Sequence, residues 1–246
     1  MKKLFLTLFT ACIAISAMAI DLPKQGLGLQ IGWAQPILRL NDYNYPISSK
    51  DSLGNVTQLY GLKVGVVYDA SYIAGFGSTM GINYTFAGGK TDWKKIDLSH
   101  SAQTSTLYHE VEVFVDWQYK FEVAKETYLM LYTGPTIQCG IAFNTTESTR
   151  DDMFDNVTSR SYNRFQRHEG AESYSDLLRL NVTWGVGAGF QYQRYFIRGG
   201  YDFGLVNPYR NREFVNPTTG ASVDRYTRGR LDQWSIKIGI YLWYHE

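Results

Sequence analysis

Apolar and polar residues alternate without interruption along residues 178–191, LRLNVTWGVGAGFQ. Every even-numbered position is apolar, and every odd-numbered position is polar, charged or glycine. Such alternation is typical of a β-strand, whose successive side chains point to opposite faces of a sheet. Strands of soluble proteins commonly run for about five or six residues. The length of this segment therefore indicates a strand that is longer than a soluble domain usually contains.

The same period of two recurs in seven further segments of the chain. They are 26–34, 60–69, 76–87, 107–119, 128–141, 195–205 and 234–244. Long polar stretches at about 35–58, 88–105, 142–177 and 206–231 alternate with short connections near 70–74, 120–126 and 191–194. An even number of antiparallel strands, with short turns at one end and long loops at the other, is the pattern of an outer-membrane barrel. We predict an all-β, eight-stranded, antiparallel, up-and-down transmembrane β-barrel with short periplasmic turns and long extracellular loops.

The residues opposite the apolar positions decide which face is outside. They are mostly Gly, Thr, Asn and Gln, with charges of both signs, and they include little of the Lys and Glu typical of a water-facing surface. In lipid, every backbone polar group must be paired, so a sheet has to close with its apolar face outward. We therefore expect the polar face to line a narrow interior. A soluble exported β-sandwich, with the apolar face inside, is the alternative.

Composition and the first residues agree with export to a membrane. Aromatic residues make up 15% of the chain and the net charge is +1, which gives no support for a nucleic-acid partner. Residues 1–19, MKKLFLTLFTACIAISAMA, resemble a secretory signal peptide cleaved after Ala19. The barrel domain would then span 20–246. A lipidated Cys12 is the alternative; with cleavage after Ala19, Cys139 is left as the single cysteine and no internal disulfide can form.

Nine charged residues fall on the predicted inner face. These are Lys63, Asp69, Glu110, Glu112, Asp116, Arg179, Arg198, Asp202 and Lys237. An eight-stranded barrel is just wide enough for side chains to fill it, and buried charges must be paired. We expect a structural salt-bridge network that holds the barrel rigid. A gated or proton-conducting path remains the alternative.

Enzymatic chemistry has little support in the sequence. The histidines are His100, His109, His168 and His245, and His168 lies close in sequence to Glu169 and Ser173. A nucleophile needs a base within hydrogen-bond reach, and no pattern here predicts that pair or a metal site. We expect no enzyme, no cofactor and no metal. A lipid-modifying barrel enzyme and a small narrow-pore channel remain the alternatives.

The last long loop is rich in arginine. It holds Arg210, Arg212, Arg225, Arg228 and Arg230. Guanidinium groups at the outer rim could pair with phosphates of lipopolysaccharide. A solvated loop with no fixed partner is the alternative.

Five stretches resemble a known group of proteins. They are LKVGVVYD, YLMLYTGPTIQCGIAF, VTWGVGAGFQY, FIRGGYDFGLVN and SIKIGIYLWY. With the leader, they resemble the PorT-like outer-membrane β-barrels of Bacteroidota and, more loosely, barrels of the OmpA and OmpX type. The resemblance implies the outer membrane of a Gram-negative bacterium, insertion by the barrel assembly machinery, and in one branch a part in protein secretion and gliding. We expect a structural or interaction protein that acts through its loops or turns.

Overall fold

The computed structural model describes residues 24–40, 56–72, 75–95, 97–166, 177–209, 212–215, 222–225 and 229–245. The predicted leader 1–19 lies outside these residues, as do His168, Arg210 and Arg228. Among the described residues, no helix is long and apolar enough to cross a membrane.

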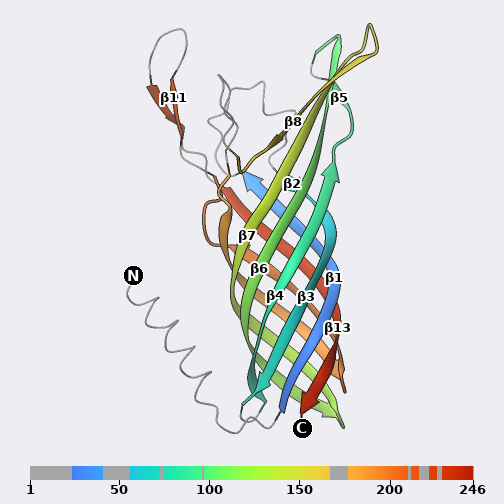
Figure 1. Cartoon of the computed structure of the whole chain (residues 1–246), viewed down its shortest axis with the longest axis vertical. Coiled ribbons are helices and arrows are strands. Elements are labelled where there is room, and N and C mark those ends of the chain that lie inside the picture. The colour runs from blue at the N-terminus through green and yellow to red at the C-terminus, as the bar shows by residue number, and fades with distance from the viewer. Residues whose placement is uncertain are drawn as a thin grey trace.

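Eight long strands close into an antiparallel barrel (Figure 1). They are β1 (Lys24–Leu40), β3 (Tyr60–Ser71), β4 (Phe76–Lys90), β6 (His100–Ala124), β7 (Thr127–Asp151), β9 (Leu180–Tyr192), β10 (Tyr195–Gly204) and β13 (Gly229–His245). Each strand pairs with the next one in this order, and β13 pairs back with β1 over most of its length. Closure leaves no free edge in the wall, and it confirms the predicted eight-stranded, up-and-down barrel.

Burial alternates along the wall as the sequence pattern predicts. On β9, Asn181, Thr183 and Gly185 are buried, whereas Val186 and Phe190 are exposed. The other strands repeat this arrangement, so that large apolar side chains cover the outside of the barrel. Examples are Leu29, Ile31, Leu62, Val64, Ile82, Val113, Leu131, Ile137, Ile197, Ile236 and Ile238. The barrel is therefore apolar outside and polar inside.

Short turns gather at one end of the barrel. The β6–β7 turn has Glu126 at φ 58° and the β9–β10 turn has Gln193 at φ 51°, two left-handed residues that reverse the chain tightly. The C-terminal end of β13 lies at this same end in Figure 1. The β6–β7 turn, the β9–β10 turn and the end of β13 therefore share one end of the barrel.

At the opposite end, two strands continue far beyond the others. β6 and β7 each have 25 residues, and they pair from the lower turn up to His100 and Asp151, with a register shift between His109 and Glu110. β5 (Lys94–Lys95) extends the sheet beside β6, and β8 (Asn156–Asn163) extends it beside β7. Figure 1 shows this four-stranded projection rising above the barrel rim. The sequence prediction of loops at 88–105 and 142–177 is wrong for these residues, because much of each stretch is strand.

The remaining strands are short. β2 (Val56–Gln58) pairs with the upper end of β1, and β11 (Arg212–Val215) pairs with β12 (Ser222–Arg225) in a separate hairpin. The predicted loops at 35–58 and 206–231 thus contain strand as well, since β1 runs to Leu40 and β13 begins at Gly229.

Candidate functional site

The centre of the barrel holds an ion pair with two carboxylates. Lys63 Nζ donates to Glu112 Oε1 and Oε2, each at 2.8 Å, and it also contacts Gln233. Gln233 Nε2 donates to Glu110 Oε1 at 2.5 Å, and Tyr108 OH donates to Glu110 Oε2 at 2.6 Å. All of these side chains are buried. Two acids from β6 therefore share one lysine from β3 through an amide bridge.

A second ion pair lies nearer the short turns. Asp69 accepts from Lys120 Nζ at 2.8 Å, from Gln118 Nε2 at 2.9 Å and from Tyr241 OH at 2.6 Å. Lys120 Nζ also donates to Gln191 Oε1 at 2.9 Å. These bonds tie β3, β6, β9 and β13 together across the interior. A charged pair with its remaining hydrogen-bonding capacity satisfied is the arrangement in which burial is tolerated.

The third pair joins opposite walls. Arg198 Nη2 on β10 donates to Asp116 Oδ2 on β6 at 2.8 Å, and its guanidinium lies 4.1 Å from the centre of the Tyr132 ring. Lys237 Nζ lies 5.3 Å from the centre of the Phe114 ring. Asp202 is half-buried, and its Cα partners are Gly185 and the buried Gln233, which places it on the inner face. Eight of the nine predicted interior charges thus lie on the inner face, and six of them make ion pairs or hydrogen bonds there.

Arg179 is the exception, and the prediction for it is wrong. Its side chain is exposed at the rim, where Nη1 donates to the carbonyl oxygens of Gly140 and Ile141 at 3.2 and 2.8 Å. Its guanidinium also lies 5.5 Å from the centre of the Phe165 ring. The reason is that Arg179 precedes the first residue of β9, Leu180, so the wall that would carry it inward has not yet begun.

Inward apolar side chains were not predicted, and they divide the interior. One cluster consists of Val67, Phe114, Met130, Phe196 and Tyr241. Val67 lies between Lys63 and Asp69 along β3, so this cluster separates the central ion pair from the lower one. Glycines make room for its rings: a Cβ on Gly239 would stand 2.2 Å from the Phe196 ring. The sequence contained the signal, because Phe114, Met130 and Phe196 occupy polar-face positions in alternating segments.

A second apolar cluster closes the upper end. It consists of Leu38, Leu59, Ala87, Tyr108, Phe143, Phe165, Leu177 and Leu231, with Tyr209 packed against it. Leu59, Phe165, Leu177 and Tyr209 come from the connections between barrel strands, and the backbones of Leu177 and Tyr209 form an isolated bridge. Loop residues therefore fold over the mouth. Among the residues that the structure describes, the two apolar clusters and the ion pairs together occupy the interior of the barrel.

We predict no large, stable conductance for the refolded protein in planar bilayers. An ion would have to cross both apolar clusters and displace buried ion pairs, each of which carries a high desolvation cost. A wide porin recorded in the same membranes is the positive control. Steady openings of the nanosiemens class from this protein would contradict the packed interior.

The arginines of the last loop separate in the structure. Arg230 belongs to β13, and its Nε lies 2.8 Å from Asp232 Oδ1. Arg212 and Arg225 occupy facing positions in the β11–β12 hairpin. Arg210 and Arg228 lie outside the described residues, as do the side chains of Arg212 and Arg225, whereas Arg230 has a defined side-chain contact. That contact belongs to a cluster with Arg39 and Tyr201 that the sequence did not suggest, since Arg39 falls in a stretch expected to be a loop.

These features define a class of protein: a closed eight-stranded antiparallel β-barrel with an apolar outer face and a plugged, charge-paired interior. No family model matches the chain, and no curated protein matches it.

Solved structures with a related arrangement are distant. Ail, the attachment invasion locus protein of Yersinia pestis, has 10% identity and a TM-score of 0.39, covering 89% of this chain and 99% of that one. Neisserial surface protein A has 11% identity and a TM-score of 0.38, covering 89% and 99%. A FadL homologue of Pseudomonas aeruginosa has 8% identity and a TM-score of 0.24, covering 93% and 94%. The closed hydrogen-bonded ring of eight strands defines the fold.

Proposed function

We propose that this chain is an integral outer-membrane protein of a Gram-negative bacterium, without enzymatic activity, that presents a rigid interaction surface outside the cell. The observation that carries the membrane assignment is the outer face of the closed barrel, which is covered by exposed Leu, Ile, Val and aromatic side chains. Soluble monomers rarely expose an apolar patch larger than a few hundred Å². Lipid is the solvent that accommodates such a belt.

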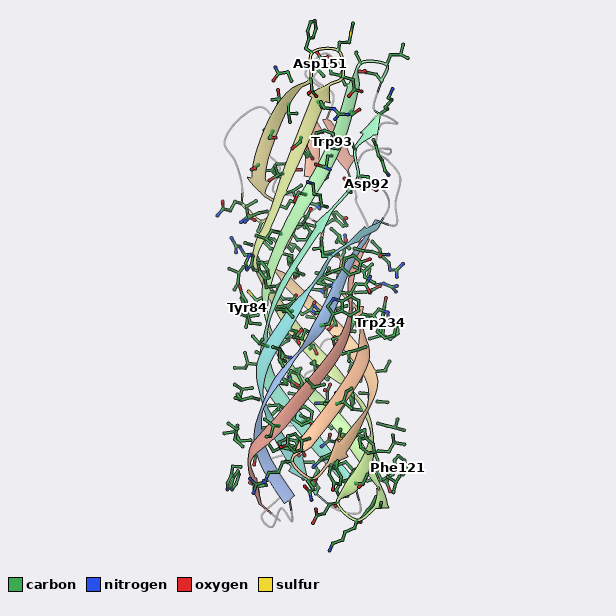
Figure 2. The ribbon with its side chains drawn as sticks, turned by 90° about the vertical axis from the view of Figure 1, so that its right-hand side faces the viewer. Tyr84, Asp92, Trp93, Phe121, Asp151 and Trp234 are labelled. Atoms are coloured by element: carbon green, nitrogen blue, oxygen red, sulfur yellow. The ribbon has the colours of Figure 1, made fainter. Side chains whose placement is uncertain are left out.

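Aromatic side chains mark the limits of the belt. In Figure 2, Tyr84 and Trp234 lie near the middle of the molecule and Phe121 lies near its lower end, with the barrel wall between them. Trp33 stacks on Tyr60 with ring centres 5.9 Å apart, and Phe121 packs against Tyr119 at 4.5 Å. Aromatic residues at two levels of a barrel wall are typical of membrane–water interfaces. The belt between them is the segment we assign to the hydrocarbon.

The interaction role rests on the projection formed by β5, β6, β7 and β8. Hydroxyl pairs such as Thr146–Ser161 and Ser148–Ser159 join β7 to β8 at 2.8 and 2.9 Å. At its tip, the backbone N–H of Asp152 donates to the Ser99 carbonyl at 2.7 Å, which ties two loops together. A hydrogen bond from Ser101 Oγ also lowers the pKa of the Asp152 carboxyl. A pre-ordered surface of this kind lowers the entropy cost of binding a partner.

The same tip carries large apolar side chains that are highly exposed to solvent. Leu98, Met153 and Phe154 are all highly exposed, and they lie in the two connections that Ser99 and Asp152 join. Exposed apolar side chains at the end of an ordered support are suited to contact another protein. A secretion-machinery component is the partner that the resemblance to PorT-like barrels implies. Co-purification from intact outer membranes tests that branch of the proposal.

Site-specific labelling tests the membrane assignment. In a Cys139→Ser background, Val182→Cys places a fluorescent label on the outer wall, and Leu98→Cys places one at the tip of the projection. We expect lipid-borne quenchers to quench the label at 182 and to leave the label at 98 unaffected. A membrane-impermeant aqueous quencher should give the reverse order. Equal access of both labels to the aqueous quencher would refute the membrane assignment.

A further inference from the structure

A cluster of two arginines around one buried aspartate lies on the outer wall near the rim. Asp232 Oδ2 accepts from Arg39 Nε at 3.0 Å, from Arg230 Nε at 3.0 Å and from Tyr201 OH at 2.8 Å. Its Oδ1 accepts from the backbone N–H of Gly204 at 2.9 Å. The Asp232 side chain is 0% exposed, whereas both arginine side chains are partly open to solvent. One fully occupied carboxylate therefore orients two guanidinium groups.

The positions of the two arginines are fixed by the sheet. Arg39 on β1 and Arg230 on β13 are Cα partners, so their side chains leave neighbouring strands at the same height. The stem of Arg230 passes over Gly204, where a Cβ would stand 2.8 Å from Arg230 Cγ. Each guanidinium reaches Asp232 through Nε, and a guanidinium carries further donors on its two Nη atoms. Within the part of the chain that the structure describes, Asp232 is the only carboxylate paired with either arginine.

The cluster stands directly above the lipid-facing stripe of β13. Arg230 and Asp232 share their face of the strand with Trp234, Ile236 and Ile238, all three of which are exposed. Trp234 also contacts Tyr201, with ring centres 5.8 Å apart and the planes at 86°. Along β13 toward the rim, the outward side chains are therefore first aliphatic, then aromatic, and finally carry a guanidinium group. Across a membrane surface the same order runs from hydrocarbon through the interface to the lipid headgroups.

We propose that Arg39 and Arg230 form a clamp for a phosphate group on the headgroup of an outer-leaflet lipid. The proposal rests on the membrane assignment made above. Among the described residues, the cluster carries two positive charges and one negative charge, a net charge that favours a further anion. Guanidinium groups bind phosphate through paired N–H donors, and they do so best when their orientation is fixed in advance. Asp232 provides that orientation through the Nε atoms of both arginines, and Tyr201 OH and the Gly204 N–H hold the Asp232 carboxylate in place.

The test measures lipid retained by the folded protein. The whole barrel is refolded with bis-phosphorylated lipid A, released into mild detergent, and examined by native mass spectrometry for bound lipid. We expect the double variant Arg39→Gln/Arg230→Gln to retain about tenfold less lipid than the wild type, since two charge-assisted contacts disappear. The matched control is Arg194→Gln, an exposed arginine in the turn at the opposite end of the barrel, which should retain lipid as the wild type does. Dephosphorylated lipid A should bind the wild type about tenfold more weakly.

Two further controls exclude misfolding and test whether charge alone is enough. Each variant must keep the heat-modifiable gel mobility of the folded barrel before its lipid is measured. The double variant Arg39→Lys/Arg230→Lys keeps the charge and should still lose lipid, because an ammonium group cannot make the paired contacts. Unchanged retention by that lysine variant would overturn the clamp.

Competition identifies which phosphate the site takes. An excess of inorganic phosphate should leave the lipid bound, and displacement of the lipid would overturn the assignment to a headgroup. A wild type that inserts normally, by the quenching of the label at 182, and yet retains phosphorylated and dephosphorylated lipid equally would overturn the clamp alone. Failure of the quenching experiment would instead remove the membrane assignment.

Discussion

Replacing Lys63 by methionine is expected to lower the free energy of unfolding by about 3–5 kcal/mol, the cost of removing one partner from a buried ion pair. Lys63 is fully buried and contacts both oxygens of Glu112 at 2.8 Å. Glu110 depends on the same lysine through Gln233. The variant leaves two carboxylates in the interior without their shared counter-charge. Urea unfolding in lipid vesicles, followed by tryptophan fluorescence, measures the change.

Two comparisons isolate the ion pair from other effects of the substitution. Lys90→Met removes an exposed lysine at the upper end of β4 and should alter stability by less than about 0.5 kcal/mol. Adding Glu112→Gln to Lys63→Met removes the uncompensated charge and should recover part of the loss. The loss of unfolding free energy in Lys63→Met should also become smaller at lower pH, because Glu110 and Glu112 are then protonated and no longer need a counter-charge. A stability of Lys63→Met equal to that of wild type would show that the interior pair is not formed.

Replacing Ile238 by arginine is expected to destabilise the barrel in a bilayer by about 2–4 kcal/mol. Ile238 is 56% exposed, and its Cα partners Ile31 and Ile197 are also exposed apolar residues on the outer wall. A charge at the middle of this belt must be buried in hydrocarbon or pull water inward. Equilibrium refolding into vesicles of a short-chain phosphatidylcholine, read by heat-modifiable mobility, gives the free-energy difference.

Leu98→Arg is the matched control for that experiment. Leu98 is 99% exposed and lies beyond the barrel, so the same chemical change there should have no measurable effect. Similar tolerance of arginine at both positions would mean that Ile238 faces water. It would thereby reject the membrane-spanning role of the wall.

Strand faces could be predicted from the sequence wherever the two faces differ in polarity. The alternation in 178–191 and in its seven counterparts placed the barrel wall and eight interior charges correctly. The alternation failed to predict strands where both faces are polar. The upper halves of β6 and β7 contain runs such as SAQTST and NTTEST, in which successive residues do not differ in polarity. These residues become strand through backbone pairing with each other and with β8, which a single sequence does not reveal.

Strand ends were the other source of error. Lys120 was expected in a short turn, although it continues the inward positions of Asp116 and Gln118 and pairs with Asp69. Arg179 was expected inside, although it stands one residue before its strand begins. The rim cluster of Arg39, Asp232 and Tyr201 joins three strands that are distant in sequence, so only their register brings it together.

The continuity of β6 and β7 has a mechanical consequence. The projection and the barrel wall share the same two strands, so a pull on the tip acts along strands that are bonded sideways to β4 and β9. Interstrand hydrogen bonds in an antiparallel sheet lie perpendicular to the strands, so such a load would shear many of them at once. A partner attached at Leu98, Met153 or Phe154 would thus transmit tension straight to the membrane-embedded wall. The projection would therefore transmit force to the barrel without first extending.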